Sequence, residues 1–274
     1  MKILLLTSNQ PNQWGLAHKI NSLHPISEIA VVDTTIITSS KKLKKTSLLK
    51  NKAKNAVGEI VTFMIFRKCW FGMLKYYSNL FSGFPVEPKI VVNNVNDSKV
   101  FELLGDLRPD ITIISGTNLL SSNLIRAISL HGRVINLHTG ISPYVKGGPN
   151  CTNWCFYLGR TDLIGNTIMW LNEGIDSGNI IATERTSFST RESLLGIHIK
   201  VMEHGHDLYL RALRKILHHE EIPNINQDML SPHRLFLSKD WGVSHRVKAL
   251  LNYLWMRSIL PESICNSETV YPIL

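Results

Sequence analysis

The chain has 274 residues, of which 44% are hydrophobic and 19% are charged, so it can bury the core of one large domain. This balance excludes an intrinsically disordered chain. The formal net charge is +9, so a basic surface that meets nucleic acid, anionic lipid or a phosphorylated ligand has to be considered.

The cysteines and the apolar stretches bear on the compartment. The four cysteines are scattered and fit reduced thiols better than a disulfide framework. Cys151 and Cys155 could lie one helical turn apart, but no second Cys/His pair completes a tetrahedral site, so we expect no metal. The opening "MKILLLTSNQ" is too short for the apolar region of a signal peptide. The stretch "AVGEIVTFMIF" falls short of the roughly 20 residues that span a bilayer. We therefore expect a soluble, cytoplasmic protein.

Strands and helices alternate along the first half of the chain. The segments "KILLLTSNQ" and "EIAVVD" are apolar runs without apolar–polar alternation, which is typical of parallel strands buried on both faces. Three further strands are predicted in "KIVVNN", "PDITIISG" and "RVINLH". The segment "DSKVFELLGDL" predicts a helix with Asp97 as its N-cap. We therefore expect an α/β fold, a doubly wound, Rossmann-like and mainly parallel sheet with helices on both faces.

A basic and aromatic helical insertion interrupts this alternation at about residues 41–81. The run "KKLKKTSLLKNKAK", from Lys41 to Lys54, holds seven lysines and no acidic residue. A solvated helix face would explain it, and so would contact with an anionic membrane together with the aromatic segment "FRKCWFGMLKYYSNLF". No signature of a nucleic-acid-binding module is present, so we expect no nucleic acid partner.

The second half of the chain predicts a helix in "PNCTNWCFYLG", a strand in "IGNTIMWL" and a turn followed by a strand in "NEGIDSGNIIATERT". A long helix is expected from about Ser189, because Ser189 and Glu192 have capping-box spacing. We expect residues 1–219 to form a catalytic domain. Residues 220–274 would form a C-terminal extension with a short strand and an amphipathic helix, which packs on its own domain or on a second copy in a homodimer.

Three polar side chains are candidates for chemistry. Asn136 and His138 end the fifth strand two residues apart, so they point to the same face. In such sheets, ligands bind beyond the carboxyl ends of the strands. Asp176 follows in the turn "NEGIDSGN", between Gly174 and Gly178, which allow a tight turn. An amide and an imidazolium can stabilise an oxyanion, and a carboxylate beside the histidine raises its pKa, so the three residues suit acyl-group transfer to a substrate amine.

The wider pattern resembles a known family. "INLHTGISPYVKGG" followed by "GNTIMWLNEGIDSGNII" is similar to the formyltransferases that use 10-formyltetrahydrofolate. These include methionyl-tRNA, glycinamide ribonucleotide and sugar N-formyltransferases. The similarity covers roughly Lys89 to Leu217, and "MKILLLTSNQ" fits the first strand. The resemblance implies that Asn136, His138 and Asp176 are catalytic and that 10-formyltetrahydrofolate is the co-substrate.

The resemblance also implies a folate site, in which backbone groups contribute much of the recognition. By position in this sequence the implied residues are Ser115, Gly116, Thr117, Asn118, Leu119, Leu120, Leu171, Asn172, Glu173 and Gly174.

The acceptor is the point at which this sequence departs from parts of the family. The 55 residues after His219 are fewer than the RNA-binding domain of the tRNA enzyme needs. The segment "TSNQPNQWG" replaces the glycine-rich phosphate loop of the glycinamide ribonucleotide enzyme. The loop "TGISPYVKGGPN" is most similar to the sugar N-formyltransferase branch.

We therefore expect an amino sugar, free or nucleotide-linked, as the acceptor. Candidate acceptor-binding residues are Asn9, Gln10, Asn12, Gln13 and Lys146. Two alternatives stay open at this point. One is an enzyme like methionyl-tRNA formyltransferase, and the other is a non-catalytic binding module on the same fold.

Overall fold

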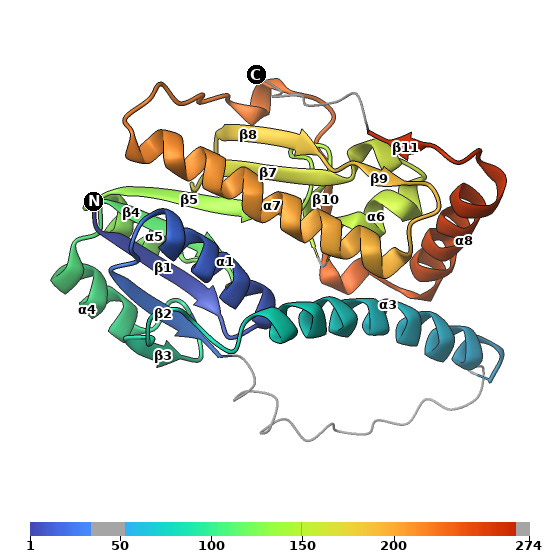
Figure 1. Ribbon diagram of the computed structural model, residues 1–274, viewed down its shortest axis with the longest axis horizontal. Helices are drawn as coiled ribbons and strands as arrows, with labels where there is room; N and C mark the ends of the chain where they lie inside the picture. The colour runs from blue at the N-terminus through green and yellow to red at the C-terminus, as the bar shows by residue number, and fades with distance from the viewer. Residues whose placement is uncertain (34–52, 149, 267–274) are drawn as a thin grey trace.

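A central sheet organises the computed structural model, which describes residues 1–33, 53–148 and 150–266 (Figure 1). In these residues seven strands form the sheet, in the order β3 (Ile90–Val92), β2 (Glu28–Val32), β1 (Ile3–Ser8), β4 (Ile111–Ser115), β5 (Arg133–His138), β7 (Gly165–Trp170) and β8 (Ile180–Arg185). The strands from β3 to β5 pair in parallel, whereas β7 runs antiparallel to both β5 and β8. Every residue of β1 and β4 is buried, which explains their unbroken apolar runs. The predicted mainly parallel α/β sheet is confirmed.

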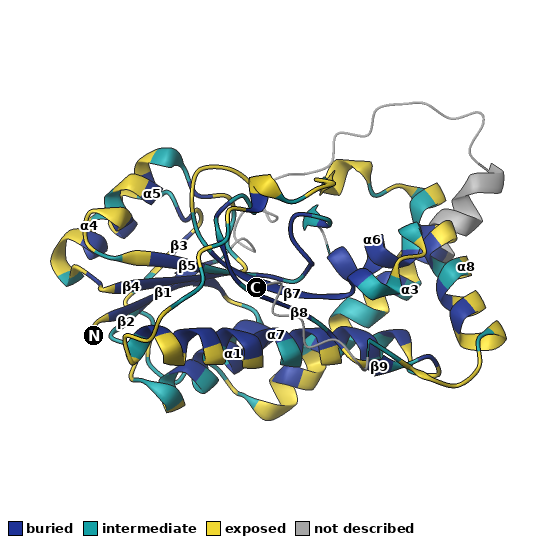
Figure 2. Cartoon of the chain, turned by 90° about the horizontal axis from the view of Figure 1, so that it is seen from above, coloured by how far each residue is buried: buried dark blue, intermediate teal, exposed yellow. Residues whose placement is uncertain are grey.

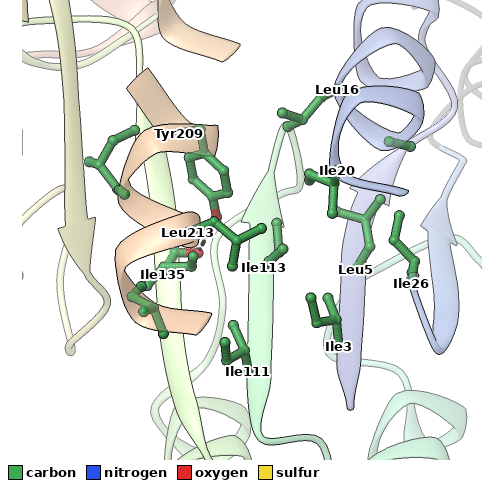
Figure 3. Packing of buried hydrophobic residues seen from close by; sticks show 14 of the residues in the cluster. Ile3, Leu5, Leu16, Ile20, Ile26, Ile111, Ile113, Ile135, Tyr209 and Leu213 are labelled. Carbon is green, nitrogen blue, oxygen red and sulfur yellow. Dashed lines mark hydrogen bonds between the residues drawn. The ribbon is translucent and has the colours of Figure 1, made fainter. Parts of the chain in front are cut away.

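Helices cover both faces of the sheet. On one face lie α1 (Pro11–Leu23) and α7 (Leu194–Leu217), and on the other lie α4 (Ser98–Leu107) and α5 (Ser122–Ser129). Figure 3 shows Leu16 and Ile20 of α1 and Leu213 of α7 directed at the isoleucines and leucines of β1, β4 and β5. Tyr209 of α7 lies in the same cluster, and its hydroxyl donates a hydrogen bond of 2.9 Å to the carbonyl of Ile135. This packing buries both faces of the central strands β1 and β4.

Two helix starts test the capping predictions. The Asp97 carboxylate accepts a hydrogen bond of 3.0 Å from the Lys99 amide, so Asp97 caps α4 as predicted. The predicted start of the long helix at Ser189 is wrong. Ser189 belongs to the two-residue strand β9 (Phe188–Ser189), which pairs with β11 (Ile264–Cys265). The cap of α7 is Ser193, whose hydroxyl accepts 2.9 Å from the Gly196 amide.

The insertion contains one long helix, α3 (Ala53–Leu80). The lysine run begins at Lys41, and most of it lies outside the described residues. Measured over the part of the chain that the structure describes, no helix combines the length and the apolar character needed to cross a membrane. The inner face of α3 is buried at Phe66, Met73 and Tyr77, and it packs against α1 and α7.

The C-terminal segment folds back onto the rest of the chain. It contains β10 (Leu235–Phe236) and α8 (Val243–Ile259), which are the predicted short strand and helix. Strand β10 pairs in parallel with β6 (Lys146–Gly147), and α8 packs on α3 and on α6 (Cys151–Leu158). Figure 2 shows α6 largely buried, with alternating buried and exposed positions along α8. The boundary at residue 219 stays a prediction.

Candidate active site

The two polar residues at the end of β5 meet the turn that follows β7. The Asp176 carboxylate oxygen Oδ2 lies 3.2 Å from Nδ1 of His138. The side chains of His138 and Asp176 are only 6% and 14% exposed, so water screens their attraction weakly. Asn136 lies on the same face of β5 and opposite Met169 of β7. Within the described residues its side-chain amide has no hydrogen-bond partner, so it is free to donate to a ligand.

Both ring nitrogens of His138 face acceptors. Nε2 lies 2.7 Å from the carbonyl of Val145 and 3.6 Å from the thiol of Cys151. Because Nδ1 faces Asp176, the ring can satisfy both sides only as a doubly protonated imidazolium. Burial alone lowers the pKa of His138, but the Asp176 charge and the contacts to Cys151 and Val145 raise it to about 10. Burial raises the pKa of Cys151, so Cys151 remains a neutral thiol. The negative charge beside His138 therefore comes from the carboxylate of Asp176.

The turn around Asp176 has the tight geometry that its glycines predicted. Asp176 has φ of 46° and Gly174 has φ of 119°, both in the left-handed half of backbone space. A Cβ on Gly178 would lie 1.5 Å from the carbonyl oxygen of Trp170. The backbone amide of Gly147 donates 2.8 Å to Oδ2 of Asp176 and fixes the carboxylate toward His138.

The loop after β5 is tied to β7 beside the histidine. The hydroxyl of Thr167 donates a hydrogen bond of 2.8 Å to the carbonyl of Gly140 and accepts one of 3.1 Å from the amide of Ser142. A Cβ on Gly140 would lie 2.5 Å from Nε2 of His138. Thr167 therefore holds the loop in direct contact with the imidazole, where only glycine fits.

Two cavities meet at these residues. Cavity A, of about 340 Å³, has walls that include Ile114, Thr117, Asn118, Leu119, Leu120, Ile125, Asn136, Gly147, Leu171, Gly174, Ile175, Asp176, Phe236, Leu237 and Ser238. Cavity B, of about 220 Å³, has walls that include Gln10, Asn12, Gln13, Trp70, Met73, Ser115, Gly116, His138, Thr139, Asn150, Thr152, His198 and Met202. Asn136 and Asp176 thus face one cavity and His138 the other.

A third cavity is larger but lies elsewhere. It has a volume of about 650 Å³ and is lined by Arg133 and Val134 at the amino end of β5. Ligands of open α/β sheets bind at the carboxyl ends of strands, where Asn136 and His138 lie. We therefore place the candidate site at cavities A and B.

The residues expected to bind folate do not all line the same cavity. Thr117, Asn118, Leu119, Leu120, Leu171 and Gly174 line cavity A. Ser115 and Gly116 line cavity B instead, because the chain turns at Gly116, whose φ is 70°. Asn172 accepts 2.6 Å from the hydroxyl of Ser177 and lines the third cavity. Glu173 points outward and pairs with Arg126 at 3.0 Å.

The residues expected to bind the acceptor divide in the same way. Gln10, Asn12 and Gln13 line cavity B. Asn9 accepts 3.1 Å from the indole of Trp14, so its side chain closes the loop before α1. Lys146 pairs through its backbone with β10, and the described walls of the two cavities do not include it.

Several wall residues were missed by the sequence analysis. Trp70 and Met73 of α3 and His198 of α7 line cavity B, and Phe236, Leu237 and Ser238 line cavity A. They come from elements expected to serve as an insertion, a long helix and an extension. Asn150 and Thr152 flank the start of α6, and their position just after the catalytic loop could have indicated them. In the described part of the chain, no three His, Cys, Asp or Glu side chains are grouped as a metal site.

Comparison with known proteins places the chain in a family. Residues 1–213 match the family model described as formyl transferase. A methionyl-tRNA formyltransferase of Syntrophus aciditrophicus is 28% identical over 168 residues, which are 60% of this chain and 53% of that relative. The chain thus spans about half the length of the curated relatives it matches.

Two solved structures share the fold. A sugar N-formyltransferase from a Shewanella species has a TM-score of 0.57 and 13% identity, over 93% of this chain and 88% of that one. An N-formyltransferase from Helicobacter canadensis, in complex with folinic acid and dTDP-3-aminofucose, has a TM-score of 0.55 and 14% identity, over 91% and 80%. Since the family model covers most of the chain, this protein belongs to the formyl transferase family.

Proposed function

We propose that the protein transfers a formyl group from 10-formyltetrahydrofolate to the primary amine of an amino sugar, in the synthesis of a surface polysaccharide or another glycan. The observation that carries this proposal is the His138–Asp176 ion pair, which lies with Asn136 at the junction of two cavities. A group-transfer enzyme with two substrates needs such a junction, because both reacting atoms must reach the same catalytic side chains.

We assign the folate to cavity A. Its wall combines apolar side chains, including Ile114, Leu120 and Ile125, with the backbone of the strand end and of the Asp176 turn. Concave, mostly apolar cavities with a few placed polar groups are typical of cofactor sites. The folinic acid complex of the similarly folded Helicobacter canadensis protein supports the same donor.

We assign the acceptor to cavity B, because its described wall is rich in neutral hydrogen-bonding groups. Asn12 is 1% exposed, and its Oδ1 has no partner among the described residues. His198 is neutral, since burial lowers its pKa to about 4. Trp70 adds a broad apolar ring, which suits the apolar face of a sugar. At about 220 Å³ the cavity is small, so we place the sugar inside and any nucleotide outside.

The residues then divide the chemistry. The folate would supply the formyl carbon, which a neutral substrate amine attacks to form the new C–N bond. The bond between the formyl carbon and the folate nitrogen then breaks, and the proton lost by the amine passes to that nitrogen, so that tetrahydrofolate leaves. The amide of Asn136 donates a hydrogen bond to the formyl oxygen as negative charge develops there, and the His138 imidazolium adds positive charge. Asp176 keeps His138 protonated and assists removal of the amine proton, directly or through water.

A second candidate is supported by the curated relatives. Those relatives are methionyl-tRNA formyltransferases, so an RNA-linked amine is the competing acceptor. A non-catalytic module is the third reading, but the intact Asn136, His138 and Asp176 arrangement argues against it.

The test is a panel of nucleotide-linked and free amino sugars incubated with 10-formyltetrahydrofolate and read by mass spectrometry. We expect one formyl group to be added to at least one sugar by the wild-type protein and to none by His138→Ala. Formylation of charged initiator tRNA with no formylated sugar would reverse the assignment of the acceptor. Absence of transfer to any amine would support the non-catalytic binding module instead.

A further inference from the structure

The C-terminal segment contacts the catalytic loop through a short parallel strand pair. Residues Leu235 and Phe236 of β10 lie opposite Lys146 and Gly147 of β6. The Lys146 amide donates 2.9 Å to the carbonyl of Arg234, and the Gly148 amide donates 2.9 Å to the carbonyl of Phe236. About ninety residues separate the two strands in the sequence, so this contact is a product of the tertiary fold.

One residue of this strand pair is hydrogen-bonded directly to the carboxylate of Asp176. Gly147, which pairs with Phe236, is also the residue whose amide donates 2.8 Å to Oδ2 of Asp176. The φ of Gly147 is 83°, and a Cβ there would lie 2.2 Å from the carbonyl oxygen of Phe236. The two backbones are therefore in contact at the residue that orients Asp176 toward His138.

The position of β10 is itself fixed by packing. The ring of Phe236 stacks on buried Trp154 of α6, with ring centroids 4.6 Å apart and an interplanar angle of 26°. Trp241 packs on the same indole at 4.7 Å and 66°. The Arg234 amide donates 3.1 Å to the carbonyl of Pro143, so the segment is tied to the catalytic loop at a second point.

The same segment also contributes to cavity A. Phe236, Leu237 and Ser238 line this cavity together with Asn136 and Asp176. Strand β10 therefore contacts Gly147, which holds the Asp176 carboxylate. Together with the residues that follow it, β10 also borders the cavity assigned to the folate.

We propose that residues 234–238, which we call the strap, complete the active site. The strap orients Asp176 through Gly147, and its side chains form one wall of the folate cavity. Phe236 is a positioning residue, because it acts on Asp176 through Gly147, and Leu237 is a binding residue. The assignment of the ligand as a folate rests on the function proposed above, whereas the positioning of Asp176 rests only on the geometry of the chain.

The experiment compares Phe236→Ala with Phe188→Ala. Both changes remove a phenylalanine ring from the same hydrophobic cluster, but Phe188 neither pairs with β6 nor lies in the described walls of the two cavities. In the Phe236→Ala protein we expect kcat to fall by roughly tenfold to a hundredfold, as expected for a slightly misplaced catalytic group. We also expect the NMR titration of His138 to move to lower pH, because a displaced Asp176 stabilises the imidazolium less. Phe188→Ala should leave both measurements unchanged.

Leu237→Ala separates the two roles of the strap and guards against a Phe236 variant that fails to fold. This change removes a cavity wall but leaves the backbone pairing of β6 with β10. Binding of folinic acid, measured by calorimetry, should weaken by roughly tenfold, a change of about 1.4 kcal/mol, with the His138 titration unchanged.

The outcomes distinguish the strap from the proposed function. Wild-type protein that does not bind folinic acid would contradict the function, while a shifted His138 titration in Phe236→Ala would still support the positioning role. An unshifted titration in folded Phe236→Ala protein, or unchanged folinic acid affinity in Leu237→Ala when the wild type binds, would overturn the strap.

Discussion

Asp176 Oδ2 lies 3.2 Å from His138 Nδ1, although 38 residues separate the two in the sequence. The pair joins the end of β5 to the turn after β7, and the adjoining amide of Asn136 has no hydrogen-bond partner within the described chain. A buried carboxylate–imidazolium pair beside a free amide donor is a suitable arrangement for stabilising an oxyanion.

Replacing Asp176 by asparagine should reduce turnover without unfolding the protein. Asparagine tolerates the left-handed backbone at φ of 46° and can still accept the Gly147 amide, but it carries no charge to hold His138 protonated. We expect kcat to fall at least about a hundredfold, which corresponds to about 3 kcal/mol of barrier. Thermal unfolding measured by circular dichroism serves as the control. Near-normal kcat in Asp176→Asn would contradict the assigned role.

Activity should persist to unusually alkaline pH for an enzyme that depends on a protonated histidine. The pKa of His138 is raised to about 10, so its stabilising charge is fully present below the ordinary value of 6.5 and is lost as pH rises through about 10. We therefore expect kcat not to fall as the pH rises through 6.5, and to fall as the pH approaches about 10. In Asp176→Asn the residual activity should decline at lower pH, because the carboxylate that raises the pKa is gone. A wild-type profile that falls through pH 6.5 would argue that His138 acts in its neutral form.

Gly140→Ala should damage catalysis through His138. The added Cβ would lie 2.5 Å from Nε2 of His138 and 2.7 Å from the Val145 carbonyl, so the ring or the loop has to move. A roughly tenfold to hundredfold loss of kcat is expected. The matched control is Gly105→Ala in α4, where no atom lies within 4 Å of the added carbon. Equal kcat in the two variants would show that the contact at Gly140 has no catalytic consequence.

Trp70→Ala should separate the acceptor from the folate. Trp70 lines cavity B, whereas the folate is assigned to cavity A. We expect KM for the amino sugar to rise about tenfold, which corresponds to about 1.4 kcal/mol of lost contact, with KM for the folate unchanged. Steady-state kinetics with each substrate varied in turn make the measurement. A rise in the folate KM alone would require the two cavity assignments to be exchanged.

The outer faces of α3 and α8 should bind an anionic lipid surface. Exposed apolar side chains on these faces are Phe63, Met64, Phe71, Val247, Leu251, Leu254, Trp255 and Ile259. Exposed basic side chains accompany them, namely Arg67, Lys68, Lys75, Lys248 and Arg257. The sequence has no acidic residue from Thr62 to Leu80 or from Val243 to Ile259. Basic and aromatic residues together are typical of surfaces that rest on anionic membranes, whereas two copies of this surface would repel one another.

Flotation with phosphatidylglycerol–phosphatidylcholine vesicles tests this surface. Wild-type protein should float with the vesicles, and Trp255→Ser combined with Lys68→Glu should not. Leu130→Ser is the control, because Leu130 is 82% exposed and stands apart on α5's C-terminal end. Absence of flotation, together with a dimeric mass that the double variant makes monomeric, would identify the surface as a homodimer interface.

The sequence by itself determined the sheet and the catalytic face. Unbroken apolar runs predict buried parallel strands, and the period of two places Asn136 and His138 on one side of β5. The glycines around Asp176 predict a tight turn, because glycine readily adopts the positive φ seen at Gly174 and allows the close backbone approach seen at Gly178. These are local properties, and each depends on a few adjacent residues.

Only the tertiary structure decided which distant elements complete the site. Trp70 and Phe236 reach the cavities because α3 packs on α1 and α7 and because β10 pairs with β6. Ser115 and Gly116 were expected in one site with Thr117 to Leu120, and the structure places them on cavity B, where the chain bends at Gly116 with a φ of 70°. Periodicity states which face of an element is buried, but the partner that buries it is chosen by long-range packing, which no single segment encodes.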